Sequence, residues 1–173
     1  MAERQAHGPA GMKIVQLGFT VRDREAAIGE WIGTMGAGPF FVADVAMPMT
    51  YRGEERPAQW KVAHGCSGNL FIELIEAAPG PSIYTARDLG LHHVMVATDG
   101  GYASLLAHFL ARGCQIAAEH DSEMARFCYL EGAPELAPFI ELYDMPPAVA
   151  DLFGRIRAAH EAWDGSDPVR PLA

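Results

Sequence analysis

The chain has 173 residues, half of them apolar and a fifth charged, which is typical of one globular domain. A formal net charge of −9 argues against a nucleic-acid partner, because phosphate binding needs clustered Lys and Arg side chains. No apolar run approaches the length of about 20 residues that spans a bilayer, and the charged N-terminus lacks the apolar core of a signal peptide. Three cysteines without metal-ligand spacing fit a reducing compartment, so the sequence predicts a cytoplasmic protein without a membrane partner.

The first half of the chain predicts one strand, one helix and three further strands. Apolar residues alternate with polar or small ones over residues 13–21, which is the period of a strand with one apolar face. Asp23 can cap the helix that follows, and the Gly- and Pro-containing stretch 35–39 ends it. Gly, Pro and charged turns then separate three apolar runs that predict strands at 40–45, 59–64 and 70–75.

The same order of elements repeats in the second half. A strand at 91–97, a turn at 98–101 and an amphipathic helix at 102–112 precede three strands, predicted at 114–119, 125–130 and 138–143. The last strands of the two halves share the tetrapeptide Phe-Ile-Glu-Leu, at 71–74 and 139–142. Because the identical letters occur at the same point of the same element order, the sequence indicates an internal duplication.

An apolar stripe after Pro146 and Pro147 predicts a last helix over about 147–163, and residues 164–173 are predicted to be draped over the domain or loose. The whole chain, 1–173, is therefore predicted to be a single α+β domain. It would consist of one module at about 13–76, a second at about 90–143, and the C-terminal helix.

Four polar residues occupy repeat-related positions in these strands. Gln16 and His93 lie in the first strands of the two halves, and Glu73 and Glu141 interrupt the two Phe-Ile-Glu-Leu strands. A buried ionised carboxylate costs several kcal/mol unless it faces water, a cation or a metal. Singly, each residue has an ordinary interpretation as a solvent-facing or structural side chain, and His92 could take the place of His93. Together they predict a shared site, whose imidazole nitrogen and carboxylate and amide oxygens suit Zn²⁺, Mn²⁺, Co²⁺ or Ni²⁺.

The duplicated order, with a polar residue in the first strand and a Glu in the last strand of each half, resembles the vicinal oxygen chelate superfamily. That superfamily includes glyoxalase I, methylmalonyl-CoA epimerase, extradiol dioxygenases and bleomycin-resistance proteins. The resemblance spans about 13–143 and is most specific at Gly90-Leu91-His92-His93-Val94, at Gly38-Pro39-Phe40 and at the two Phe-Ile-Glu-Leu strands. It implies two βαβββ modules that form a cupped, partly open mixed sheet.

The resemblance also implies a site for one divalent metal ion, with four ligands: Gln16, Glu73, His93 and Glu141. His93 is preferred to His92 because it lies seven residues before Gly100, as Gln16 lies seven before Asp23. In the superfamily the metal binds substrate oxygens and stabilises an enolate, while a nearby carboxylate moves the proton. Glu141 is the first candidate for that catalytic role and Glu73 the second.

Other residues that face into the cupped sheet are predicted to bind the substrate: Phe41, Met47, Met49, Tyr51, His64, Met95, Phe127 and Tyr129. Three methionines and four aromatic residues without Lys or Arg predict a roomy apolar pocket. The expected substrate is therefore hydrophobic, aromatic, terpenoid or steroid-like, and carries a carbonyl group or vicinal oxygens.

These features favour a metal-dependent isomerase, epimerase or lyase that acts beside a carbonyl group. One alternative is a metal-free sequestering protein of the resistance type, although such proteins usually lack the ligand set. An extradiol dioxygenase is less favoured, because it needs two His and one carboxylate and the chain has Gln16 at the partner position. The resemblance further predicts a homodimer, and the apolar stripe of the last helix has two possible uses, to cover the domain itself or to meet the partner.

Overall fold

The two halves of the chain have the predicted element order in the computed structural model, which describes residues 12–97, 101–123 and 125–172. The first half comprises β1 (Lys13–Thr20), α1 (Arg24–Met35), β2 (Phe40–Tyr51), β3 (Glu54–Ser67) and β4 (Leu70–Ala77). The 3-10 helix η1 (Ile83–Thr85) connects it to the second half. That half comprises β5 (Gly90–Ala97), α2 (Tyr102–Ala111), β6 (Gln115–Asp121), β7 (Arg126–Glu131) and β8 (Phe139–Asp144). The helix α3 (Pro147–Glu161) and the short strand β9 (Val169–Pro171) follow. The turn predicted at 98–101 lies mostly outside the described residues.

The nine strands form one mixed sheet in the order β3-β4-β1-β5-β8-β7-β6-β2-β9. The modules join where β1 and β5 pair antiparallel. Because β2 pairs with both β6 and β3, the sheet closes into a barrel, and the prediction of a partly open sheet is wrong in this respect.

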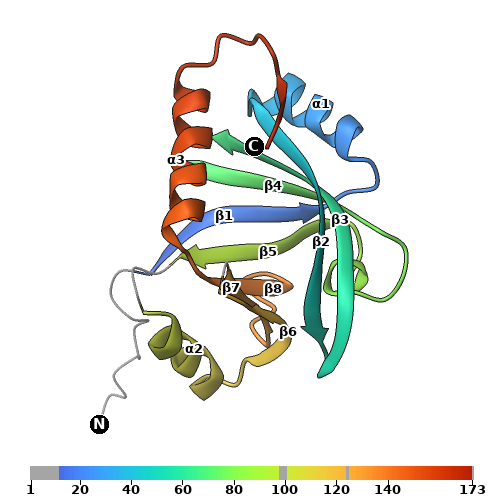
Figure 1. Ribbon diagram of the computed structural model, residues 1–173, viewed down its shortest axis with the longest axis vertical. Helices are drawn as coiled ribbons and strands as arrows, with labels where there is room; N and C mark the ends of the chain where they lie inside the picture. Colours follow the sequence, from blue (N-terminus) through green and yellow to red (C-terminus); the bar gives the residue numbers. More distant parts are fainter. Residues whose placement is uncertain (1–11, 98–100, 124, 173) are drawn as a thin grey trace.

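The closure depends on the length of the β2–β3 hairpin. The sequence predicts strands at 40–45 and 59–64, whereas β2 and β3 continue to the turn at residues 52–53. The far end of β2 supplies the two residues that reach β6, Thr50 opposite Glu119 and Tyr51 opposite Ala118. Figure 1 shows the long hairpin running down the molecule to β6.

The barrel has helices on different sides of its wall. Ile28 of α1 packs on the outer face of β4, against Ile72 and Leu74. Ile156 of α3 packs against Phe71, whose side chain lies on the opposite face of β4, toward the barrel interior. Figure 1 shows α3 standing at one end of β4, β1 and β5, where it covers the end of the barrel. Each helix of the described residues is too short or too polar to cross a membrane.

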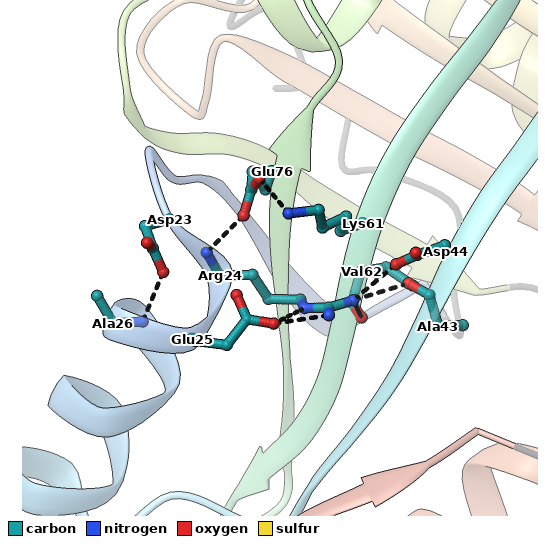
Figure 2. Close-up of polar contacts among 9 residues, drawn as sticks. All are labelled: Asp23, Arg24, Glu25, Ala26, Ala43, Asp44, Lys61, Val62 and Glu76. Carbon is teal, nitrogen blue, oxygen red and sulfur yellow. Dashed lines mark hydrogen bonds and ion pairs between the residues drawn. The ribbon is translucent and has the colours of Figure 1, made fainter.

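Polar contacts fix the start of α1 to the sheet (Figure 2). The Asp23 carboxylate accepts a hydrogen bond from the Ala26 amide at 2.9 Å, as predicted for a helix cap. Glu76 of β4 accepts from the Arg24 amide at 2.9 Å and from Lys61 Nζ at 2.7 Å. One carboxylate from the sheet therefore satisfies both a free amide at the helix N-terminus and a lysine of β3.

Part of the C-terminal segment lies along the domain, which is the first of the two arrangements predicted for residues 164–173. Residues Val169–Pro171 form β9, which pairs parallel with Phe40–Val42 of β2. A strand this short is formed by the free edge of β2 and not by its own apolar pattern, so periodicity does not reveal it.

Candidate metal centre and adjoining pocket

Four neighbouring strands bring Gln16, Glu73, His93 and Glu141 together. Each of the strands β4, β1, β5 and β8 contributes one of these four side chains, and all four lie on the inner face of the barrel. Gln16 Nε2 donates a hydrogen bond to Glu73 Oε2 at 2.9 Å. His93 Nε2 lies 3.2 Å from Glu73 Oε2 and 3.2 Å from Glu141 Oε2. All four residues are buried, so their donor atoms form a compact group shielded from bulk water.

The donor atoms of this group are incompletely paired. Gln16 Oε1 and His93 Nε2 are buried and have no hydrogen-bond partner of good geometry among the described residues. One ligand atom from each of Glu73, His93 and Glu141 lies within 4.8 Å of the others. Buried polar atoms without good hydrogen bonds beside two carboxylates are a costly arrangement unless a cation or a proton compensates the charge. The residues therefore fit a divalent ion with mixed nitrogen and oxygen ligands.

The pKa shifts of the residues in this centre reflect an excess of negative charge from the two carboxylates. Burial disfavours the charged form of His93, but the carboxylates of Glu141 and Glu73 outweigh this effect and raise the pKa of His93 to about 9. Burial raises the pKa of Glu73, yet the adjacent imidazole of His93 and the nearby imidazoles of His64 and His92 lower it overall. In the protein without a cation, a proton on His93 compensates the carboxylates, and a divalent ion could take its place.

Gly18 lies directly beneath the imidazole of His93. The two residues face each other across the β1–β5 ladder. A Cβ atom at Gly18 would lie only 1.9 Å from His93 Cε1, so any other residue would collide with the ring. Close approach of the ring to β1 therefore requires glycine at this position.

A cavity of about 180 Å³ adjoins the four polar residues. Five of the predicted substrate-binding residues lie in its wall: Met47, His64, Met95, Phe127 and Tyr129. His64 also approaches the centre, with Nε2 3.9 Å from Glu73 Oε1 and with Nδ1 buried and unpaired among the described residues.

The other three predicted substrate-binding residues lie outside the wall. Met49 is in the packed core of the barrel, because β2 at this point has passed the cavity. Tyr51 lies at the junction of β2 with β6, and Phe41 packs against the buried cluster that contains Phe71 and Ile156. The alternation of the sequence predicts which face of β2 these side chains occupy. It does not predict whether they lie beside the cavity or beyond it.

The wall also contains residues that the sequence did not single out. Trp60 and Val62 share the face of β3 with His64, and Tyr143 follows Glu141 by two positions in β8, so strand alternation could have found them. Tyr84 of η1 had no such pattern, yet its hydroxyl lies 3.1 Å from that of Tyr129 inside the barrel.

The start of α3 and the C-terminal segment complete the cavity with Met145, Val149, Leu152, Phe153 and Leu172. The apolar stripe of α3 thus covers the domain itself, one of the two uses that the sequence allowed. Throughout the described part of the chain, the residues that line this cavity include neither Lys nor Arg.

Comparisons with solved structures show where this fold occurs. A hypothetical protein BH1468 from Bacillus halodurans C-125 superposes with a TM-score of 0.54 at 16% identity, covering 79% of this chain and 96% of its own. Methylmalonyl-CoA epimerase from Mycobacterium tuberculosis gives 0.53 at 13% identity, covering 79% and 90%. A methylmalonyl-CoA epimerase in complex with methylmalonyl-CoA and NH4+ gives 0.51 at 17% identity, covering 80% and 96%. At these identities the likeness shows a common fold.

Comparison at the level of sequence identifies the family. No protein in a search of curated proteins matches the chain. The family model described as Glyoxalase/Bleomycin resistance protein/Dioxygenase superfamily matches residues 15–129, which include most of both modules. The chain therefore belongs to this superfamily, the vicinal oxygen chelate group that its duplicated strands and paired glutamates resemble.

Proposed function

We propose that this protein is a metal-dependent enzyme that moves a proton on carbon beside a carbonyl group, as an isomerase, an epimerase or a lyase. The observation that carries the proposal is the convergence of Gln16, Glu73, His93 and Glu141 beside an apolar cavity. Two buried polar atoms in this group, Gln16 Oε1 and His93 Nε2, lack a hydrogen-bond partner of good geometry among the described residues. A sequestering protein without a metal would gain nothing from such a costly group.

The metal ion would be held by Gln16 Oε1, His93 Nε2 and one oxygen each of Glu73 and Glu141. When bound, the ion supplies a Lewis acid that polarises a substrate carbonyl and stabilises the charge that develops on its oxygen. The mixed donor set suits Zn²⁺, Mn²⁺, Co²⁺ or Ni²⁺.

Glu141 is the proposed general base. Its carboxylate lies in the cavity wall, and its position in β8 is opposite Tyr129 of β7. Because the residue is buried, the carboxylate meets a substrate C–H group without competition from bulk water. Glu73 or His64 could return the proton from another side, since both line the same cavity.

The Tyr84–Tyr129 pair is the proposed donor to a substrate oxygen. Burial raises the pKa of each phenol well above its ordinary value, so both stay protonated. One hydroxyl proton is used in the 3.1 Å hydrogen bond between them, and the other remains available at the cavity.

The size and the lining of the cavity restrict the class of substrate that is expected. Its apolar wall favours a hydrophobic group, and a cavity of about 150 Å³ is known to hold a benzene molecule. The buried part of the substrate is therefore about one ring or one short branched chain, next to the carbonyl group. A steroid or an extended terpenoid would have to project past α3.

Deuterium exchange together with metal analysis tests the proposal. Protein purified without chelator should contain about one divalent ion per chain. In D₂O the protein should introduce deuterium at the carbon beside the carbonyl of a small aryl or branched alkyl ketone. NMR of the ketone measures this exchange. The panel includes methylmalonyl-CoA and the glutathione–methylglyoxal adduct, which the superfamily's epimerases and glyoxalases suggest.

The substitution Glu141→Gln tests the proposed base, because it keeps the shape of the side chain but cannot accept a proton at neutral pH. We expect exchange to fall by about 10²–10⁴-fold while the melting temperature is kept. Full exchange in this variant would assign the base to Glu73 or His64. Metal-free protein that binds the ketone tightly and exchanges no proton would instead support the sequestering function.

A further inference from the structure

His92 directly precedes the proposed ligand His93 in β5, yet the side chains of both residues lie beside the candidate metal centre. Side chains of consecutive strand residues normally point to opposite faces. Here the β1–β5 register shifts: Gly18 is opposite His93, whereas Phe19 is opposite Leu91. His92 is therefore the extra residue of a β-bulge, a feature that can redirect a side chain.

The bulge places both imidazoles on the inner side of the sheet. The ring centroids of His92 and His93 lie 5.6 Å and 5.3 Å from that of Tyr129. His92 Nδ1 is 2.9 Å from His93 Nδ1, and its Nε2 is 3.1 Å from the Ile83 carbonyl oxygen. His92 is 1% exposed and also packs against the ring of Phe139.

These two contacts determine which nitrogens carry protons. A carbonyl oxygen only accepts, so His92 Nε2 must carry a proton and donate it to Ile83. A cation held by His93 Nε2 would use the lone pair of that nitrogen, so the ring proton of His93 lies on Nδ1 and is donated to His92 Nδ1. The remaining nitrogen of His93, Nε2, is the atom that faces the Glu73 and Glu141 carboxylates.

We propose that His92 is a positioning residue that holds His93 with Nδ1 protonated and Nε2 directed into the metal centre. The inference rests on the proposed function, because it assigns a role toward the metal. A rotation of the His93 ring by half a turn would put a carbon against His92 Nδ1 and lose the hydrogen bond. Hydrogen bonds of this kind to the second nitrogen of a ligand histidine orient the ring and strengthen binding.

NMR of the metal-free protein tests the proton positions directly. In full-length protein with ¹⁵N-labelled histidine, long-range ¹H–¹⁵N spectra distinguish a protonated from an unprotonated ring nitrogen. We expect His92 to be protonated at Nε2 alone, and His93 to carry a proton at Nδ1 both before and after Zn²⁺ is added. A proton on His92 Nδ1, or a His93 protonated at Nε2 alone, would overturn the inference without reference to activity.

Two substitutions separate the two hydrogen bonds of His92. His92→Asn keeps an acceptor oxygen near the position of Nδ1, whereas His92→Gln keeps a donor near Nε2 for the Ile83 carbonyl. In competition with a chromophoric chelator, His92→Gln should bind Zn²⁺ about 10–100-fold more weakly than the wild type. His92→Asn should recover most of that loss.

His120→Gln is the matched control, because His120 also contacts a carbonyl, that of Pro48 at 2.7 Å, and does not line the cavity. Its Zn²⁺ affinity should equal that of the wild type. Wild-type affinity in His92→Gln, or an equal loss in both His92 variants while circular dichroism shows them folded, would contradict the inference. If the wild-type protein binds none of Zn²⁺, Mn²⁺, Co²⁺ and Ni²⁺, both the inference and the proposed function are wrong. A contrary NMR result alone would overturn only the inference about His92.

Discussion

Gly18 and His93 show how strongly one residue can depend on its cross-strand partner. Sequence alternation places Gly18 on the same face of β1 as Gln16, but nothing in the pattern says that a ring lies above it. In the structure a single methyl group at this position would overlap the imidazole of His93 in the candidate metal centre.

Gly18→Ala should therefore weaken Zn²⁺ binding strongly and lower the free energy of unfolding by about 1–3 kcal/mol, the usual range for overpacking. Chelator competition and urea denaturation measure the two effects. Gly29→Ala is the control, because Gly29 lies in α1 with nothing within 4 Å of an added Cβ. It should be neutral or stabilise the protein by up to about 1 kcal/mol. Zn²⁺ binding by Gly18→Ala at wild-type strength would show that β1 can move away from the ring.

At the scale of elements, the start of α1 depends on a carboxylate from β4. The hydrogen bond from Lys61, followed by that from the Arg24 amide, lowers the pKa of Glu76 below its ordinary value of 4.5. A carboxyl group with a lower pKa in the folded state stabilises the protein above its unfolded-state pKa. This contribution is lost as the pH falls through the lowered value.

Glu76→Gln should accordingly reduce the free energy of unfolding by about 0.5–1 kcal/mol at pH 7, a small effect because solvent screens the partly exposed pair. The difference from the wild type should shrink as the pH falls from about 4.5 and the wild-type carboxylate is protonated. Urea denaturation at several pH values measures it. The control is Glu30→Gln, at an exposed position of the same helix. A deficit in Glu76→Gln that stays constant down to pH 2 would exclude the ionised carboxylate as its cause.

α3 has two functions along its length. Its first turns contribute Val149, Leu152 and Phe153 to the cavity wall. Its last turn is fixed to the domain by His160, whose Nδ1 donates to the Gly38 carbonyl at 2.5 Å. The first turns of the helix therefore line the cavity, while its last turn is held in place on the domain.

Leu152→Ala should enlarge the cavity and shift the preference toward bulkier substrates, measured as the ratio of kcat/KM for two ketones of different size. Loss of the half-buried side chain should also cost about 1–3 kcal/mol of stability, less on average than the loss of a fully buried leucine. Leu136→Ala, at a leucine that is 66% exposed, serves as the control and should change neither property. An unchanged substrate ratio in Leu152→Ala would mean that α3 does not limit the size of the bound group.

At the scale of the whole molecule, the assembly of the protein stays a prediction. The resemblance implies a homodimer, but the apolar stripe of α3 packs on its own domain and gives the dimer no separate support. We expect light scattering at micromolar concentration to report twice the chain mass of 18.7 kDa. A mass of 18.7 kDa would contradict the prediction.

The sequence alone determined the order of elements and the inner faces of the strands that hold the site. Period-2 alternation and the repeated Phe-Ile-Glu-Leu strands depend on local chemistry, so the repeat by itself predicts that Gln16, Glu73, Glu141 and one of the adjacent His92 and His93 share a site. Only the tertiary structure decided the closure of the barrel, because it depends on Thr50 and Tyr51 reaching β6.

Only the tertiary structure also decided the fit of the cavity and the environment of His93. The size of the cavity depends on α3, and the proton positions of His93 depend on the bulge at His92 and on the Ile83 carbonyl. These features arise from register and packing between segments far apart in the chain. Local periodicity reports which face a residue occupies, but it contains no information about what lies opposite.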